Sequence, residues 1–161
     1  MIPSFWIRTA WTLLLGACTP LGLWIYEDPI IWLHQITLEL REPAPPGSFP
    51  VVVALAMENP NDYPLSTERV ELFLRVDGIA IGRLDHNGAV PVAMDTISTV
   101  AMPLTLERKT TRAHLQALES GTRLFAVRGR ATFRTPIGVR KVRFAQEGTM
   151  IFGQRSRGTS P

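Results

Sequence analysis

A two-residue alternation of apolar and polar side chains runs along most of the chain and limits it to a narrow group of folds. It is clearest over 36–40, 70–76 and 125–134, where an apolar or small residue stands at every second position. Successive side chains of a β-strand point to opposite faces, so the alternation predicts strands with one buried face. The segment 51–57 (VVVALAM) is apolar throughout, as expected of the central strand of a sandwich.

Turn signals separate these segments at short intervals. Asp77-Gly78 is a tight-turn pair, and residues 135–138 (TPIG) form a second turn before the final strand. A strand over 97–106 is expected to bend at Pro103, which indicates an edge or a bulge there. The 13 Pro and 12 Gly among 161 residues argue against a bundle of long helices. About seven strands result, so we expect an all-β, seven-stranded antiparallel β-sandwich.

One segment departs from this pattern. Within residues 110–120, Thr111, Leu115 and Leu118 recur at helical spacing, and Gly121 follows in the position that favours the end of a helix. We therefore expect one short amphipathic helix between two strands.

The first residues of the chain predict export. Arg8 precedes a short apolar run over 10–15, and residues 15–18 (LGAC) resemble the lipobox of bacterial lipoproteins. The resemblance implies a signal peptide over 1–17, cleavage before Cys18, and a lipid anchor on that cysteine. Several acyl chains hold a protein on a bilayer stably, whereas one chain binds only marginally.

Two other interpretations of this segment remain open. Residues 9–26 carry no charge, so the leader could stay attached as a signal anchor, although Pro20 is unfavourable for a spanning helix. Alternatively, Cys18 is only a small apolar residue. Threonine, not aspartate, follows Cys18, and in lipoproteins of double-membrane bacteria this implies the periplasmic face of the outer membrane.

Residues 18–34 are expected to hold the lipidated cysteine, a linker and the entry to the first strand. They contain an aromatic and aliphatic cluster that includes Trp24 and Trp32. These side chains would either lie at the membrane interface, which indole rings favour, or pack in the first strand.

The middle of the chain resembles a known family. The run Asn59-Pro60-Asn61 follows an apolar strand and precedes an alternating strand that ends in Asp77-Gly78. This arrangement is similar to type 2 late-embryogenesis-abundant (LEA) proteins, also called the water-stress and hypersensitive-response (WHy) domain. The resemblance covers the expected domain at 35–152, before a basic tail at 153–161.

The resemblance implies an immunoglobulin- or fibronectin-III-like sandwich and a link to desiccation and stress tolerance, without catalytic residues or a cofactor. Pro60 restricts Asn59, and Asn61 can bond backbone amides in an Asx-turn, so we expect these three residues to be structural. The function expected is therefore a non-enzymatic, lipid-anchored protein of the cell envelope that binds or protects. The alternative is a module that binds an apolar ligand or lipid inside the sandwich.

Charge is distributed unevenly between the two halves of the chain. Residues 1–80 carry a net charge of −5 and residues 81–161 a net charge of +8, which gives +3 in total. If the alternation over 125–134 holds, Arg128, Arg130 and Arg134 form a row on the outer face. This row either contacts an anionic lipid or another acidic envelope component, or is a solvated face paired with Glu39 or Glu71. The candidate contact residues are Arg128, Arg130, Arg134, Lys141 and Arg143.

The sequence offers no residue set for catalysis or metal binding. His34, His86 and His114 lie far apart and lack the spacing of metal ligands, and no nucleophile elbow or phosphate-binding loop is present. We therefore expect no enzyme activity, no cofactor and no metal. Nucleic acid is a poor candidate partner, because no aromatic residues are interleaved with the arginines. The sequence does not determine the oligomeric state.

Overall fold

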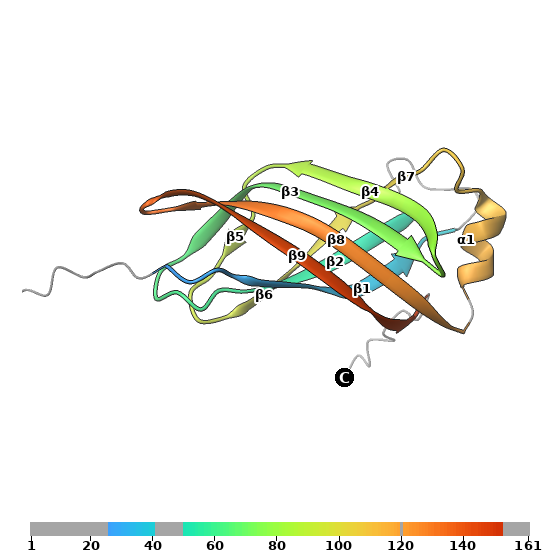
Figure 1. Cartoon of the computed structure of the whole chain (residues 1–161), viewed down its shortest axis with the longest axis horizontal. Coiled ribbons are helices and arrows are strands. Elements are labelled where there is room, and N and C mark those ends of the chain that lie inside the picture. Colours follow the sequence, from blue (N-terminus) through green and yellow to red (C-terminus); the bar gives the residue numbers. More distant parts are fainter. Residues whose placement is uncertain (1–25, 41–49, 120, 153–161) are drawn as a thin grey trace, which may run out of the picture.

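In the computed structural model, which describes residues 26–40, 50–119 and 121–152, the chain forms an antiparallel β-sandwich with one short helix (Figure 1). Among the described residues, seven strands have at least seven residues, and two further strands have only two residues each. The elements in chain order are β1 (Ile30–Leu38), β2 (Val51–Glu58), β3 (Leu65–Val76), β4 (Ile79–Asn87), β5 (Pro91–Val92), β6 (Ile97–Pro103), β7 (Thr105–Leu106), α1 (Arg112–Leu118), β8 (Thr122–Thr135) and β9 (Gly138–Ile151).

The strands form two sheets. One has three strands in the order β1-β2-β6, so β2 is central, as the apolar segment 51–57 predicts. The other has six strands, in the order β7-β4-β3-β8-β9 with β5 paired to β3. Every strand pair in both sheets is antiparallel. The all-β prediction is confirmed, and the structure adds the two-residue strands β5 and β7 to the expected count.

One apolar core lies between the sheets. The predicted alternation holds over 70–76 in β3 and over 125–133 in β8, where the alternating apolar side chains are buried and those between them are less buried. Among the largest fully buried side chains are Phe133, Phe152 and Leu55, which come from β8, from the residue after β9 and from β2. The apolar composition of β2 is thus accounted for by packing within the sandwich.

Both predicted turns are present. Asp77 and Gly78 have φ angles of 49° and 79°, the positive values that a type I′ hairpin needs at both central positions. At the other hairpin Thr135 pairs with Gly138, and the Thr135 hydroxyl accepts from the Ile137 amide at 3.3 Å. The β8–β9 turn lies at the opposite end of the sandwich from α1 (Figure 1).

At Pro103, where the sequence predicts a bend, the chain passes from one sheet to the other. β6 ends at Pro103 as an edge strand of the three-stranded sheet, and β7 begins two residues later on the edge of the six-stranded sheet. A proline lacks the amide hydrogen needed to continue a ladder, and an edge strand tolerates that loss.

The helix agrees with the sequence pattern, whereas the first strand begins and ends earlier than expected. Thr111 caps α1 by accepting from the His114 amide at 3.3 Å, and Leu115 and Leu118 are the buried residues of the helix. β1 begins at Ile30, five residues before the boundary expected at 35. Trp32 therefore lies in the first strand, whereas Trp24 and Cys18 lie outside the described residues, as does the expected tail at 153–161.

Candidate functional site: the outer face of the six-stranded sheet

The predicted row of arginines lies on the outer face of β8. Phe125, Val127 and Phe133 are buried in the core, so the side chains of opposite parity on this strand face away from it. The side chains of Arg128 and Arg134 are 80% and 75% exposed, whereas that of Arg130 is only 43% exposed. The three arginines share a face, but their surroundings differ.

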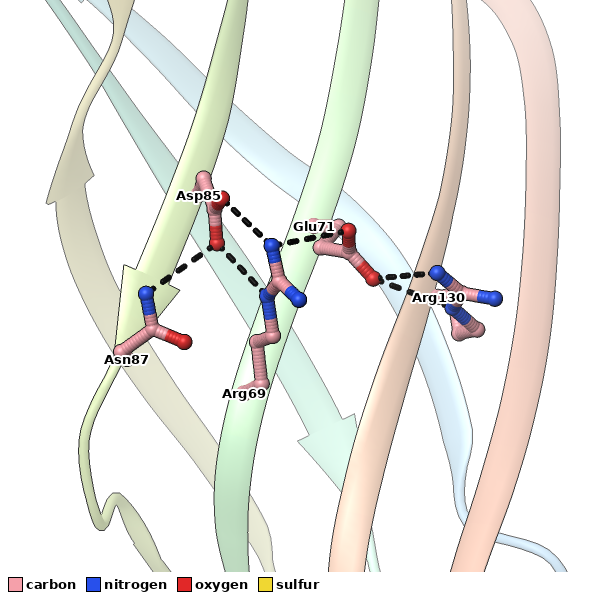
Figure 2. A network of polar contacts seen from close by, with 5 residues as sticks. All are labelled: Arg69, Glu71, Asp85, Asn87 and Arg130. Carbon is pink, nitrogen blue, oxygen red and sulfur yellow. Dashed lines mark hydrogen bonds and ion pairs between the residues drawn. The ribbon is translucent and has the colours of Figure 1, made fainter.

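Arg130 belongs to a network of ion pairs that crosses three strands (Figure 2). Its Nε and Nη2 atoms donate to Oε2 of Glu71, directly opposite on β3, at 3.0 and 2.6 Å. The other oxygen of Glu71 lies 3.3 Å from Nη2 of Arg69. Glu71 thus bridges two guanidinium groups. Of the two interpretations of the arginine row, pairing with Glu71 across the sheet applies to Arg130.

The network continues onto β4. Arg69 donates from Nε and Nη2 to the two carboxylate oxygens of Asp85, at 2.8 and 2.6 Å, in a bidentate arrangement. The hydrogen bond from Arg69 is the main cause that holds the pKa of Asp85 below its usual value. The same hydrogen bond raises the pKa of Arg69. Asn87 adds a bond of 3.4 Å to Asp85 (Figure 2).

The other candidate cations divide into paired and unpaired groups. Arg134 donates from Nε and Nη2 to Oε1 of Glu68 at 2.9 and 2.7 Å. Arg128 reaches Glu147 only at 4.0 Å, and both side chains are exposed. Lys141 and Arg143 have no ion-pair partner among the described residues. Of the predicted contact residues, Arg128, Lys141 and Arg143 are therefore the ones available to an external anion.

A shallow depression of about 420 Å³ lies beside this network. Phe73, 38% exposed, stands in it between Arg83 on β4 and Arg128 on β8, its direct neighbours across the sheet. Sequence reasoning missed Arg83 and Phe73. The alternation over 70–76 showed that Phe73 would face outward, but no local signal gave the orientation of Arg83 or showed which strand lies beside which.

The Asn59-Pro60-Asn61 turn is a second polar network, and it is buried. Oδ1 of Asn59 accepts from the backbone and side-chain amides of Asn61, at 3.1 and 2.9 Å. Nδ2 of Asn59 donates to the Tyr63 carbonyl at 2.8 Å and to the Ala93 carbonyl at 3.3 Å. The side chain of Asn59 therefore closes the Asx-turn. The sequence had predicted that Asn61 would close it.

Asn61 has a different role. Its side-chain oxygen accepts from the Glu27 amide at 2.9 Å, and its Nδ2 donates to the Glu27 carbonyl at 2.8 Å. This pair of bonds joins the chain ahead of β1 to the turn after β2. The two asparagines of the turn thus connect segments that are distant in sequence through buried or partly buried hydrogen bonds.

The described residues contain no group of three or more His, Cys, Asp or Glu side chains placed to hold a metal ion. Over the same residues, no helix is long and apolar enough to cross a membrane. The lipidation expected at Cys18 lies outside the described part of the chain.

The fold defines the class of protein as an antiparallel β-sandwich. The solution structure of the Arabidopsis thaliana protein AT1g01470 is similar, with a TM-score of 0.51 and 9% identity over 66% of this chain and 72% of that one. This likeness shows a shared fold. No protein-family model matches the sequence, and no curated protein matches it either.

Two other solved structures align with lower scores. One is the solution structure of a protein provisionally described as late embryogenesis abundant, at a TM-score of 0.47 and 9% identity, covering 78% of this chain and 72% of that one. The other is a crystal structure of a protein from Archaeoglobus fulgidus, at a TM-score of 0.44 and 15% identity, covering 78% and 95%.

Proposed function

We propose that this chain is a non-enzymatic, lipid-anchored protein of the bacterial cell envelope whose sandwich is a LEA type 2 (WHy) domain. Its role would be binding or protection under desiccation stress. The observation that carries the proposal is the Asn59-Pro60-Asn61 run, on which the resemblance rests. Its two asparagines form a buried network that joins the segment ahead of β1 to the turn after β2. The seven longer strands support the immunoglobulin- or fibronectin-III-like arrangement that the family implies.

The anchor is the part of the proposal that connects the domain to the envelope. Cleavage before Cys18 would leave seven residues, 19–25, between the acylated cysteine and the first described residue, Tyr26. Seven extended residues span roughly 25 Å at most, so the sandwich would be held close to the bilayer. The threonine after Cys18 supports placement on the periplasmic face of the outer membrane.

Expression of the full chain in a bacterium with lipid labelling tests the anchor. Cys18→Ser should abolish labelling and leave the leader attached, whereas Thr19→Asp should keep the label and move the protein to the inner membrane. If the polypeptide mass of the mature protein, without attached lipid, is the same for the wild type and for Cys18→Ser, the lipobox interpretation is wrong. A wild-type chain that keeps its leader would instead establish the signal anchor.

The protective role needs a separate measurement. A strain that lacks the protein should survive drying less well than its parent, and the full chain should restore survival. Equal survival of the two strains over a range of drying times would contradict a role in desiccation.

A further inference from the structure

The β8–β9 hairpin ends in a tip that is both apolar and basic. Ile137 and Val139 are 48% and 54% exposed at the turn and the start of β9. Arg134 precedes them, and Arg140 and Lys141 follow directly. From residue 134 to residue 146 the chain contains no acidic side chain. Exposed aliphatic residues with adjacent cations are the combination found on protein surfaces that bind the interface of anionic membranes.

The N-terminal segment joins the domain beside this tip. The Arg140 guanidinium carbon lies 5.7 Å from the centre of the Tyr26 ring, and Tyr26 is the first residue that the structure describes. The same two residues, with Asp28, Ile137, Val139 and Lys141, line an open hollow of about 1100 Å³. Residues 1–25, which contain Cys18 and the apolar leader, therefore connect to the sandwich at the hairpin tip.

The far end of the same sheet provides a comparison. Ile79, Leu124 and Ile151 are also exposed, by 51% to 63%, at the end of the sheet opposite the tip. Carboxylates accompany them: Asp77 accepts from the Leu124 amide at 3.1 Å, and Glu147 lies on the strand that ends at Ile151. Exposed apolar residues and arginines occur at both ends, since Arg123 is next to Leu124 and Arg155 and Arg157 follow Ile151 in the sequence. Arg123, however, is paired with Asp77 at 3.4 Å, and residues 1–25 connect to the sandwich at the tip.

Acidic groups offset part of the positive charge of the tip. Asp62 is one of them, because it and Arg140 both act electrostatically on Tyr63. Glu68 is bound by Arg134 at 2.7 Å, and Asp28 lies in the hollow with Arg140. Lys141 has no ion-pair partner among the described residues, and neither does Arg143, two residues further along β9. These two cations face outward on the same side of the strand.

We propose that the β8–β9 tip lies on the anionic surface of the membrane that holds this chain. Ile137 and Val139 enter the boundary between headgroups and acyl chains, while Arg140 and Lys141 contact lipid phosphates. This inference rests on the proposed membrane anchor and adds an orientation to it: the sandwich stands with its tip on the bilayer and α1 directed away.

A fluorescent label at the tip tests the orientation in the full chain. Cys18→Ser leaves no native cysteine and keeps the apolar leader on the chain as a tether, so Ile137→Cys provides a single site for a polarity-sensitive dye. The protein is reconstituted into vesicles of phosphatidylcholine alone or with phosphatidylglycerol. The dye should brighten and shift to the blue on the anionic vesicles. The same dye at Leu124→Cys, on the opposite end, should not respond.

Matched charge variants separate a local contact from net charge. Arg140→Gln with Lys141→Gln should lower the ratio of bound to free tip about thirtyfold, at ~1 kcal/mol for each cation near the surface. Arg75→Gln with Arg83→Gln removes the same net charge from the same sheet, away from the tip, and should leave the ratio unchanged. Both positions of the tip pair are exposed, so the fold should be retained, and circular dichroism checks it.

Several outcomes would overturn the inference. If the chain floats with the vesicles while the dye at 137 gives the same emission on both lipid compositions, the leader tethers the chain but the tip does not contact anionic lipid. Equal losses from the two double variants would show a response to net charge alone. A Cys18→Ser chain that floats with neither kind of vesicle has neither a leader tether nor a tip contact, which contradicts the orientation. The acyl anchor is judged separately, by lipid labelling of the wild-type chain.

Discussion

The molecule contains two polar networks of similar size, one buried at the Asn59-Pro60-Asn61 turn and one exposed on the outer face of the six-stranded sheet. The first consists of neutral amides, and its central residue, Asn59, is 0% exposed. The second consists of full charges, yet the side chains of Arg69 and Asp85 are 43% and 48% exposed. Bond lengths do not separate the two networks, since both contain contacts below 3 Å.

The difference between the networks is their access to water. A buried donor or acceptor that loses its partner keeps the full cost of its desolvation, about 1–3 kcal/mol for each group. An exposed ion pair that is broken regains hydration, so such pairs contribute only ~0–1 kcal/mol. We therefore expect the neutral network to stabilise this fold more than the charged one.

The largest effect should come from Asn59→Ala. The substitution leaves the Tyr63 carbonyl and the Asn61 amide without their partners in the core, and we expect a loss of about 3 kcal/mol in unfolding free energy. Urea unfolding of the fragment that begins at Tyr26 measures it. Asn59→Asp keeps the acceptor and removes the donor, so it should be similarly severe. A loss below about 0.5 kcal/mol would remove the contrast between the two networks.

A smaller effect is expected from Glu71→Gln. The change removes the negative charge that bridges Arg69 and Arg130, and we expect a loss of ~1 kcal/mol that shrinks in concentrated salt. Glu147→Gln is the matched control, because its contact with Arg128 spans 4.0 Å between exposed side chains and should be worth little. Equal losses from the two variants would mean that the bridging geometry contributes nothing.

The smallest effect concerns pH. Because the pKa of Asp85 is lower in the folded chain than in the unfolded one, its ionised form stabilises the fold. That contribution is complete above the unfolded pKa and is lost as the pH falls through the folded one. Asp85→Asn should therefore reduce the acid sensitivity of the melting temperature below about pH 4. Identical pH profiles for the two proteins would contradict a stabilising Arg69–Asp85 pair.

Local signals predicted more of the fold than of the candidate site. The type I′ turn at Asp77-Gly78 and the outward row on β8 depend on residues close in sequence, and both are present. The pairing of Arg69 with Asp85 joins residues 16 positions apart, and that of Arg130 with Glu71 joins residues 59 apart. Alternation shows which way a side chain faces but not which strand lies next to it.

The sequence by itself determined the longer strands to within a few residues, the buried faces of β3 and β8, two of the turns and the short helix, because these follow from the backbone geometry of a few neighbouring residues. Only the tertiary structure decided which cations are neutralised. A bulge at Glu68 shifts the register of β3, and the register of β3 against β8 sets Glu71 opposite Arg130 while Lys141 and Arg143 remain without ion-pair partners among the described residues. Strand order and register depend on how the whole core packs, and the core joins residues distant in sequence. For the same reason, the meeting of Tyr26 with Arg140 at the hairpin tip became visible only in the folded chain.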